Sequence, residues 1–306
     1  MEKNNQLRCG IAAIVGRPNT GKSTLLNAIL GEKVSIVSNI PQTTRYQIKG
    51  IFTDKRGQII FIDTPGMHLP NQRLGSLMVR QIEEAVSSSN VIIYLVDTND
   101  APGREENLMM QRLKDAKVPI ILGLNKIDGR AIFLDTYIRI WEEQKGKSAN
   151  EMADSLILMP LSSLGGTNVT VLVDTIFNLL PKTKLLYPED IVSDFPQRLA
   201  LADIIREKLF HIMRQEIPYF LAVYIEEMQS RSPKLTYIRA VILVERESQK
   251  AIVVGRDGHV LKDIGQLARE EFEELLGKKV FLETQVKVKP GWRENPEILR
   301  QLGHLQ

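Results

Sequence analysis

The chain is organised around residues 16–24, GRPNTGKST, which fit the pattern GxxxxGK[ST]. The apolar run 11–15 precedes them and the helix-like run 25–30 follows them. A short buried strand, a glycine loop and a helix start form the context of a phosphate loop, in which backbone N–H groups surround phosphate oxygens. The stretch therefore predicts a nucleotide site, where Lys22 reaches the β- and γ-phosphates and the Ser23 hydroxyl ligates Mg²⁺.

Composition places the chain among globular proteins. Of its 306 residues 43% are hydrophobic and 25% are charged, and the length suits two domains. The net charge of +3 gives no support by itself for a nucleic-acid partner. Cys9 is the only cysteine, which excludes disulfides and cysteine metal clusters and suits a reducing cytoplasm. The first six residues lack an apolar core, so no secretory signal is expected.

Two loops after the phosphate loop are candidates for sensing the γ-phosphate. Residues 31–45 are poor in apolar periodicity and rich in hydroxyls, which predicts an irregular loop. Thr44, favoured over Thr43, would bind Mg²⁺ and the γ-phosphate only when that phosphate is present. Residues 47–53 and 58–62 then predict a hairpin whose second strand leads to DTPG, residues 63–66. There Asp63 would hold Mg²⁺ through water, and the Gly66 N–H would contact the γ-phosphate.

A third motif indicates which base is bound. Residues 91–96 and 118–124 predict buried strands, and residues 74–88 and 105–116 predict helices, so the sheet should be mostly parallel with helices on both faces. The second strand leads to NKID, residues 125–128. The Asp128 carboxylate can accept hydrogen bonds from guanine N1–H and its 2-amino group, a donor pair that adenine lacks. We expect Asn125 to brace the loops, Lys126 to lie along the base, and the backbone after strand 156–159 to reach guanine O6.

Together these motifs resemble translation-factor-related GTPases, and residues 16–27 with 42–45 more narrowly resemble the Era family of ribosome-assembly GTPases. The resemblance extends over the whole chain. It implies an α/β P-loop GTPase domain with a mostly parallel six-stranded sheet at 1–182, a linker at 183–195, and a smaller α+β KH domain, type II-like, at 196–306. It also implies GTP or GDP and Mg²⁺ as ligands, the 3′ end of small-subunit (16S-type) ribosomal RNA as partner, and a role in 30S subunit assembly. A cytoplasmic location is expected, with peripheral attachment to the cell membrane in some members.

The second half of the chain matches the RNA-binding part of this resemblance. A helix is expected at 196–215, strands at 220–227, 237–244, 250–254 and 280–289, and a helix at 259–276. Gly255-x-x-Gly258, between a strand and a helix, is how a KH domain clamps a sugar-phosphate backbone. Asp257 departs from the basic or glycine residues common there, and either repels phosphate or points outward. Trp292 either stacks a base or packs at the domain end.

Two residues of the first half bear on hydrolysis. Met67 stands where classical small GTPases carry a water-positioning glutamine, so intrinsic hydrolysis should be slow. In related GTPases an asparagine at the position of Asn19 helps to hold K⁺, which predicts faster hydrolysis in K⁺ than in Na⁺.

The predicted sites are therefore these. GTP would be bound by Gly16, Arg17, Pro18, Asn19, Thr20, Gly21, Lys22, Ser23, Thr24, Asp63, Thr64, Pro65, Gly66, Asn125, Lys126, Asp128, Ser162, Ser163 and Leu164. The catalytic set would be Lys22, Thr44, Asp63 and Gly66, with Ser23, Thr44 and Asp63 on Mg²⁺ and Asn19 on K⁺. RNA would be bound by Gly255, Arg256, Asp257, Gly258, Lys262, Lys287 and Lys289, with Lys278, Lys279 and Arg293 as further backbone contacts.

Three other functions are less consistent with the sequence. A P-loop metabolic kinase would not need the guanine carboxylate of Asp128, and no second substrate pocket is evident in the sequence. A constitutive RNA-binding module with a decayed nucleotide site conflicts with the intact Lys22, Ser23, Thr44 and Asp63. A tRNA-modifying GTPase shares the phosphate loop, but its partner domain differs from residues 196–306.

Overall fold

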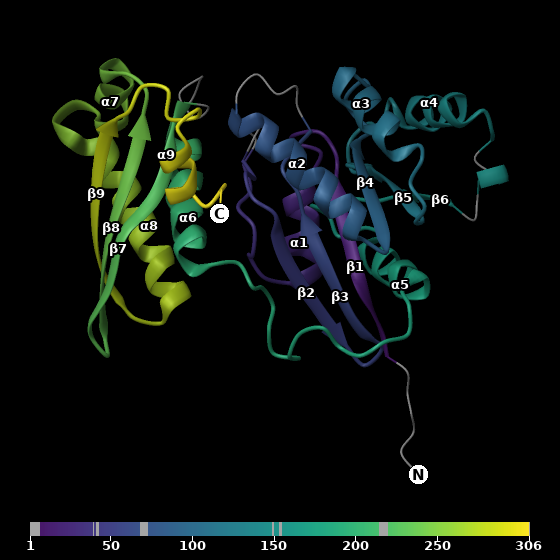
Figure 1. The fold of residues 1–306 in the computed structure, drawn as a ribbon, viewed down its shortest axis with the longest axis horizontal. Helices are drawn as coiled ribbons and strands as arrows, with labels where there is room; N and C mark the ends of the chain where they lie inside the picture. Colours follow the sequence, from purple (N-terminus) through teal and green to yellow (C-terminus); the bar gives the residue numbers. More distant parts are fainter. Residues whose placement is uncertain are drawn as a thin grey trace, which may run out of the picture. The chain divides into compact units, whose positions relative to one another are not determined.

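The computed structural model describes residues 7–38, 40, 43–67, 73–148, 150–152, 155–213 and 220–305 (Figure 1). The chain divides into two compact units, one of residues 1–71 and 75–194 and one of residues 72–74 and 195–306. Within the described residues, no helix is both long and apolar enough to cross a membrane.

The first unit contains a six-stranded sheet in the order β2-β3-β1-β4-β5-β6. Only β2 is antiparallel to its neighbour, β3, among the pairs in this sheet's described strands. This is the mostly parallel sheet predicted from the buried apolar runs, and the predicted hairpin is confirmed. The strands are β1 Arg8–Val15, β2 Ile48–Asp54, β3 Gly57–Asp63, β4 Val91–Asp97, β5 Ile120–Asn125 and β6 Leu156–Pro160.

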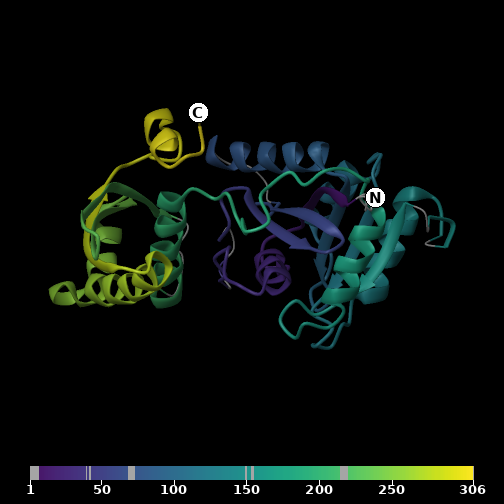
Figure 2. The same cartoon turned by 90° about the horizontal axis from the view of Figure 1, so that it is seen from below.

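Helices cover both faces of this sheet, as predicted. Figure 2 shows α2 on one face and α1 on the other. Apolar residues of α2, α3 and α4 share one core with β1, β4 and β5, including the buried Met109, Tyr137 and Trp141. The helices are α1 Lys22–Leu30, α2 Arg73–Ser88, α3 Arg104–Leu113, α4 Leu134–Lys145 and α5 Val169–Leu179, with a 3₁₀ turn, η1, at Asn150–Met152.

Residues 183–194, the greater part of the predicted linker, pack on β2 and β3. The Ile51 N–H donates to the Val192 carbonyl at 2.7 Å. The fully buried side chain of Gln58 accepts the N–H groups of Leu186 and Tyr187 at 3.0 and 2.9 Å. This segment is therefore an ordered part of the first unit, which ends at Asp194.

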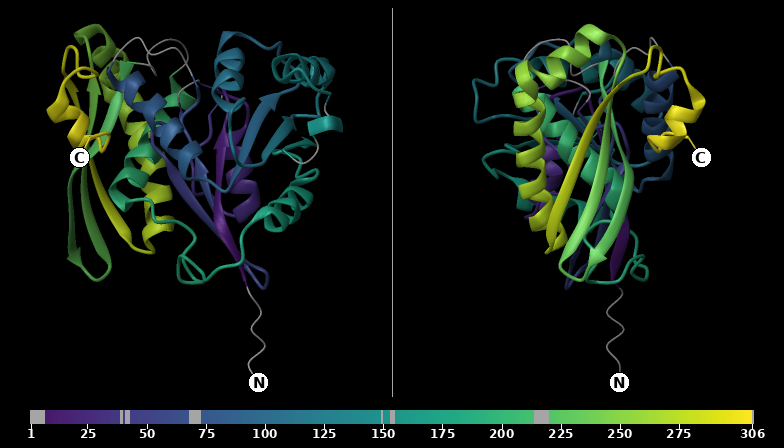
Figure 3. Two further views of the ribbon diagram at one scale, coloured as in Figure 1. Left: turned by 45° about the vertical axis from the view of Figure 1, so that its right-hand side comes forward. Right: turned by 90° about the vertical axis from the view of Figure 1, so that its left-hand side faces the viewer.

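The second unit contains a three-stranded sheet in the order β7-β8-β9, with β7 antiparallel and β9 parallel to β8. The right-hand view of Figure 3 shows α8 lying along this sheet. The predicted helices at 196–215 and 259–276 are present, although residues 214 and 215 lie outside the described residues. The elements are α6 Gln197–Ile212, β7 Ala222–Ser232, β8 Leu235–Val244, α7 Glu247–Val254, η3 Arg256–Gly258, α8 His259–Leu276, β9 Lys279–Val288 and α9 Pro296–Gln301.

One predicted strand is wrong. Residues 250–254 are the second half of α7, because the Gln249 side chain accepts the N–H groups of Glu245 and Arg246 and so starts a helix there. Ala251 and Ile252 are both exposed and Val253 is fully buried, which departs from the strict alternation of a strand. Gly255-x-x-Gly258 therefore connects two helices.

Candidate functional site

The phosphate loop joins the end of β1 to the start of α1, and two of its glycines have no room for a side chain. A Cβ at Gly16 would lie 2.3 Å from the Leu95 carbonyl oxygen, and one at Gly21 would lie 2.4 Å from Asn125 Nδ2. Gly21 also has φ +97°, a left-handed conformation that favours glycine. These contacts fix the loop at the carboxyl edge of the parallel strands, where ligands bind in such sheets.

Lys22, at the first position of α1, folds back over the loop. Its Nζ donates to the carbonyl oxygens of Gly16 at 3.2 Å and Arg17 at 2.8 Å. The residue is 6% exposed. Burial lowers the pKa of the Lys22 ammonium to about 8, against the opposing effect of the Asp63 carboxylate. Burial therefore destabilises the charged form of Lys22, and a bound phosphate would stabilise it.

This pKa predicts a pH dependence of nucleotide binding. A bound phosphate raises the Lys22 pKa above its value of about 8 in the free site, so binding above that pH takes up a proton. The affinity for GDP should therefore fall as pH rises through 8, by up to about tenfold per pH unit. Titration of GDP binding between pH 7 and 9 measures the slope. The Lys22→Met variant should lose this slope and keep only the pH dependence that comes from ionisation of the guanine base. Equal slopes in both proteins would contradict the assignment of the slope to Lys22.

Ser23, Thr44 and Asp63 meet beside the loop. The Ser23 hydroxyl lies 2.6 Å from Asp63 Oδ2 and 2.9 Å from Thr44 Oγ1, and Ser35 donates to the same Asp63 oxygen at 3.0 Å. Asp63 is fully buried, and burial raises the pKa of its carboxyl, opposed by Lys22. Its Oδ1 has no hydrogen-bond partner among the described residues. An unpaired buried carboxylate oxygen beside two hydroxyls fits Mg²⁺, whose preferred ligands are oxygens.

The two candidate threonines have different surroundings. Both line the cleft. Thr43 donates to the Ile40 carbonyl at 2.6 Å, whereas Thr44 lies against Ser23. The geometry therefore favours Thr44, as the sequence did. Pro41 and Gln42, which belong to the same predicted loop, lie outside the described residues.

The segment after β3 is packed against the loop. A Cβ at Gly66 would lie 2.7 Å from Pro18, so the two backbones approach closely. The Thr64 hydroxyl donates to the Ile14 carbonyl at 2.8 Å. The Met67 side chain is 1% exposed and belongs to the hydrophobic core, and its N–H donates to Gly16. Met67 is thus directed away from the cleft as well as being chemically unsuited to orient water.

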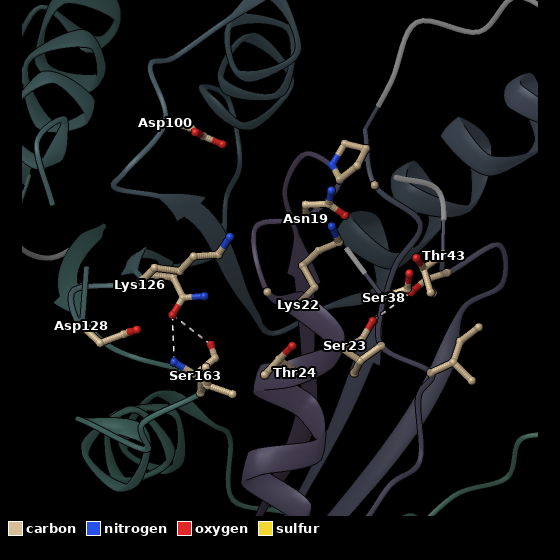
Figure 4. A pocket seen from close by; sticks show the side chains of 18 residues that line it. Asn19, Lys22, Ser23, Thr24, Ser38, Thr43, Asp100, Lys126, Asp128 and Ser163 are labelled. Carbon is tan, nitrogen blue, oxygen red and sulfur yellow. Dashed lines mark hydrogen bonds between the residues drawn. The ribbon is translucent and has the colours of Figure 1, made fainter. Parts of the chain in front are cut away.

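The base-recognition motif follows β5. The Asn125 amide donates to the Thr20 carbonyl at 2.7 Å and accepts from the Ser163 N–H at 2.9 Å. It therefore joins the phosphate loop to the loop after β6, as expected of a brace. Lys126 Nζ lies 2.5 Å from Asp97 Oδ2. Figure 4 shows Lys126, Asp128 and Ser163 grouped apart from Ser23 and Thr43 across the cleft.

Most of these groups line one cleft of about 510 Å³. Its lining residues are Pro18, Asn19, Gly21, Lys22, Ser23, Thr24, Ile36, Val37, Ser38, Thr43, Thr44, Gly66, Asp100, Asn125, Lys126, Asp128, Ser163 and Leu164. The predicted residues that are not in this lining are Gly16, Arg17, Thr20, Asp63, Thr64, Pro65 and Ser162. Two of them support residues near the cleft: the Thr64 hydroxyl donates to the Ile14 carbonyl of β1, and the Ser162 hydroxyl accepts the Gly165 N–H.

Residues 97–100, from the last residue of β4 into the loop before α3, also belong to the site, although they match none of the motifs recognised in the sequence. The Thr98 hydroxyl donates to the Asn125 carbonyl at 2.8 Å, and the Asn99 amide donates to the Lys126 carbonyl at 2.9 Å. Asp100 contacts Arg17 at 2.9 Å and lines the cleft. The available signal was position, because DTND follows a buried parallel strand at the edge where the other motifs lie.

The candidate RNA site of the second unit lies on η3. A Cβ at Gly255 would lie 2.4 Å from Val260 Cγ2, and its φ is +73°. Asp257 has φ +53°, and its side chain is 93% exposed, 3.8 Å from Arg256 Nε. The aspartate thus points into solvent. Lys262 and Lys289 are exposed, whereas Lys287 is paired with Glu226 at 2.8 Å.

Three further predicted contacts of the second unit differ in their surroundings. Trp292 is fully buried and donates to the Phe220 carbonyl at 3.1 Å, so its role is packing and it offers no face to a base. The Arg293 side chain is only 12% exposed and lies over the Phe220 ring, which leaves little of it for a phosphate. Lys278 is exposed, and Lys279 is paired with Glu273 at 2.8 Å.

Comparison with known families gives one match in each half. Residues 11–126 match the family described as "50S ribosome-binding GTPase", and residues 216–293 match the KH domain. Full-length relatives include GTPase Era of Carboxydothermus hydrogenoformans, 44% identical with 97% of each chain covered. GTPase Era of Thermotoga maritima is 42% identical, with 96% of each chain covered.

Two solved structures are similar over nearly the whole chain. One is Era in complex with MgGDPNP and nucleotides 1506–1542 of 16S ribosomal RNA, with TM-score 0.90 and 38% identity, covering 98% of this chain and 100% of that chain. The other is a single-residue variant of Aquifex aeolicus Era bound to GDP·AlF4⁻, with TM-score 0.89, 38% identity and the same coverage.

Proposed function

Because the chain belongs to the Era family of GTPases, we propose that it is a GTP-hydrolysing switch that binds the 3′ end of small-subunit ribosomal RNA and assists 30S subunit assembly. One observation carries this proposal: a single cleft is lined by the phosphate loop, by Ser23 and Thr44 with the buried Asp63 hydrogen-bonded to Ser23, and by Asp128. Such a cleft suits a guanine nucleotide with its metal, and the matched KH region supplies the RNA-binding half.

At the phosphate end, the proposed roles follow from the groups present. Lys22 would exchange its two carbonyl contacts for phosphate oxygens, and Gly66 would present its N–H to the γ-phosphate. Ser23, Thr44 and Asp63 would hold Mg²⁺, which when bound neutralises charge on the phosphate oxygens. Because the Ser23 and Thr44 hydroxyls are in contact, the position of the loop that carries Thr44 depends on this cluster. Loss of the γ-phosphate after hydrolysis would release Thr44.

At the base end, Asp128 would accept the two guanine donors, with Lys126 along the ring. Asn125 is bonded to Thr20 and Ser163, so it would hold the phosphate and base ends at a fixed separation. The backbone of residues 162–164 would face guanine O6. A nucleotide lacking the 2-amino group leaves part of the Asp128 carboxylate unpaired, which disfavours it.

In the RNA-binding half, the proposed clamp is Gly255-x-x-Gly258 between α7 and α8, with Lys262 and Lys289 as exposed phosphate contacts. The family description covering residues 11–126 refers to the 50S subunit, whereas the full-length Era complex contains 16S RNA. The second comparison includes the KH half, so we propose the small subunit as the target.

RNA binding and GTP hydrolysis test the proposal together. The purified full chain should bind a strand copied from the 16S 3′ end more tightly than its scrambled sequence at the same salt concentration, and should hydrolyse GTP in Mg²⁺. Equal affinity for the two strands would contradict the assigned RNA target. Absence of hydrolysis would contradict the enzymatic part.

Asp257 provides a local test of the clamp. Its carboxylate is 93% exposed on the loop that would face the sugar-phosphate backbone. Asp257→Lys should strengthen binding of both specific and scrambled RNA by about three- to tenfold and steepen the salt dependence, because it replaces a repulsive charge with a phosphate contact. Asp263→Lys, on the exposed surface of α8, serves as the charge-matched comparison. An Asp257 effect no larger than that of Asp263 would place the RNA backbone elsewhere.

Hydrolysis should also depend on the monovalent cation. Asn19 lines the cleft on the exposed turn of the phosphate loop, where a K⁺ ion could supply the charge that an arginine finger supplies elsewhere. We expect GTP hydrolysis to be about tenfold or more faster in K⁺ than in Na⁺ at equal ionic strength. Asn19→Ala should remove most of this difference. Equal rates in the two salts for the unmodified protein would exclude the K⁺ site.

Location is the remaining proposal. The family resemblance suggests a cytoplasmic protein with peripheral attachment to the inner face of the cell membrane. Co-sedimentation with vesicles containing anionic lipids tests this attachment, and a chain that stays in the supernatant at low salt would contradict it.

A further inference from the structure

Glu106 is a buried acid with no role in the proposed chemistry. It lies in the first turn of α3, and its side chain is 1% exposed. A carboxylate so far from water needs a compensating charge and hydrogen bonds. Its surroundings therefore indicate what the residue is there to hold.

The two carboxylate oxygens of Glu106 have separate partners. Oε1 lies 2.8 Å from Arg17 Nε in an ion pair and makes no hydrogen bond with a described residue, and Oε2 accepts the Gly103 N–H at 2.8 Å. Arg17 also contacts Asp100 Oδ2 at 2.9 Å, but that side chain is 67% exposed. Because water screens an exposed pair, Glu106 is the stronger of the two anchors. The second oxygen meanwhile caps α3.

Arg17 connects this anchor to the phosphate loop. Its guanidinium does not line the cleft, although the next two residues, Pro18 and Asn19, do. Its carbonyl oxygen accepts Lys22 Nζ at 2.8 Å and the Thr20 hydroxyl at 3.1 Å. The Arg17 side chain thus connects the phosphate loop to α3, while the Arg17 carbonyl contacts Lys22 and Thr20 within the loop.

We propose that Glu106 is a positioning residue for nucleotide binding, which acts through Arg17 by fixing the phosphate loop against α3. The inference rests on the proposed GTP binding. The loop would hold phosphates that GDP and GTP share, so the anchor contributes equally to substrate, transition state and product. Its loss should therefore raise KM and leave kcat unchanged.

The Glu106→Gln variant separates the anchor from the helix cap. Its amide oxygen can still accept the Gly103 N–H, but its NH2 group then faces the Arg17 guanidinium, donor against donor. We expect the Kd for GDP and the KM for GTP each to rise about tenfold, with kcat unchanged. The ratio of GTP to ITP affinity should stay constant, because the Asp128 end of the cleft is untouched.

A matched control is Glu83→Gln. It removes an exposed ion pair, 3.2 Å long, between Glu83 of α2 and Arg112 of α3, the helix that also carries Glu106. It should leave Kd and KM within about twofold of the unmodified protein. Arg17→Met alone would strand the buried Glu106 charge and is expected to impair folding, so the double variant Arg17→Met/Glu106→Gln is the second test. The single and the double variant both lose the Arg17–Glu106 ion pair, and the Arg17–Asp100 pair that the double variant also loses is exposed and weak. The double variant should therefore reproduce the tenfold rise.

Three results would overturn the inference. Glu106→Gln with a lowered melting temperature but unchanged Kd and KM would make Glu106 purely structural. A fall in kcat at constant KM would place its effect on the chemical step. A further large rise in the double variant would show that the two residues act separately. Failure of the unmodified protein to bind GDP would instead contradict the proposed function, which distinguishes the two claims.

Discussion

Replacing Asp128 with asparagine is expected to weaken GTP binding by about a hundredfold or more, because the two guanine donors lose the carboxylate that accepts their hydrogen bonds. The asparagine NH2 group would face guanine N1–H and the 2-amino group, donor against donor. The same NH2 group can donate to the 2-carbonyl of xanthine, so XTP binding should improve as GTP binding falls. Competition of GTP and XTP against a fluorescent nucleotide measures both changes.

The control for this substitution is Asp115→Asn, which makes the same chemical change at an exposed residue after α3. Its affinity for GTP should stay within about twofold of the unmodified protein. A variant of Asp128 that keeps the order GTP over XTP would show that Asp128 does not contact the base. The guanine specificity would then have to come from the backbone of residues 162–164.

Gly21→Ala should abolish measurable nucleotide binding, a loss of about a hundredfold or more, for a reason that is purely geometric. The new Cβ would lie 2.4 Å from Asn125 Nδ2 at φ +97°. Either the loop or Asn125 must move, and Asn125 is bonded to Thr20 and Ser163. A displacement near 1 Å at a positioned site can cost two orders of magnitude.

Gly31→Ala separates this steric effect from the general cost of a side chain at positive φ. Gly31 caps the other end of α1 with φ +73°, and a Cβ there meets nothing within 4 Å among the described residues. It should lose about 1 kcal/mol of stability and keep its affinity for GDP. Isothermal titration of both variants gives the comparison, and equal losses would refute the proposed collision with Asn125.

Much of the first unit could be predicted because its strands are continuous apolar runs bounded by polar motifs. Residues 91–96, for example, are buried on both faces of the sheet, and their length excludes a helix of ordinary size. Helices α4 and α5 were not predicted. Leu134, Tyr137, Ile138 and Trp141 have helical spacing, but they belong to none of the recognised motifs. The strand predicted at 250–254 was wrong because four apolar residues in a row fit either a strand or a buried helix turn.

The site itself was predicted only as far as local motifs reach. Lys22 begins the helix that follows β1, and Asp63 and Asn125 end β3 and β5, so the parallel topology brings all three to one edge of the sheet. The contact of Arg17 with Glu106 joins residues 89 positions apart, and nothing in the spacing indicates it. The burial of Trp292 could not be predicted either. It is a large aromatic residue in a basic stretch, and only its packing around Phe220 shows that it cannot stack a base.

The most direct test of the central claim is the affinity of the full chain for the 16S 3′-end strand with GDP, with a non-hydrolysable GTP analogue and without nucleotide, at one salt concentration. A nucleotide-operated switch predicts that sequence-selective binding is tighter in one nucleotide state than in the others, while the scrambled strand is unaffected. Equal affinity in all three states would contradict the switch and leave GTP hydrolysis and RNA binding as independent activities of one chain.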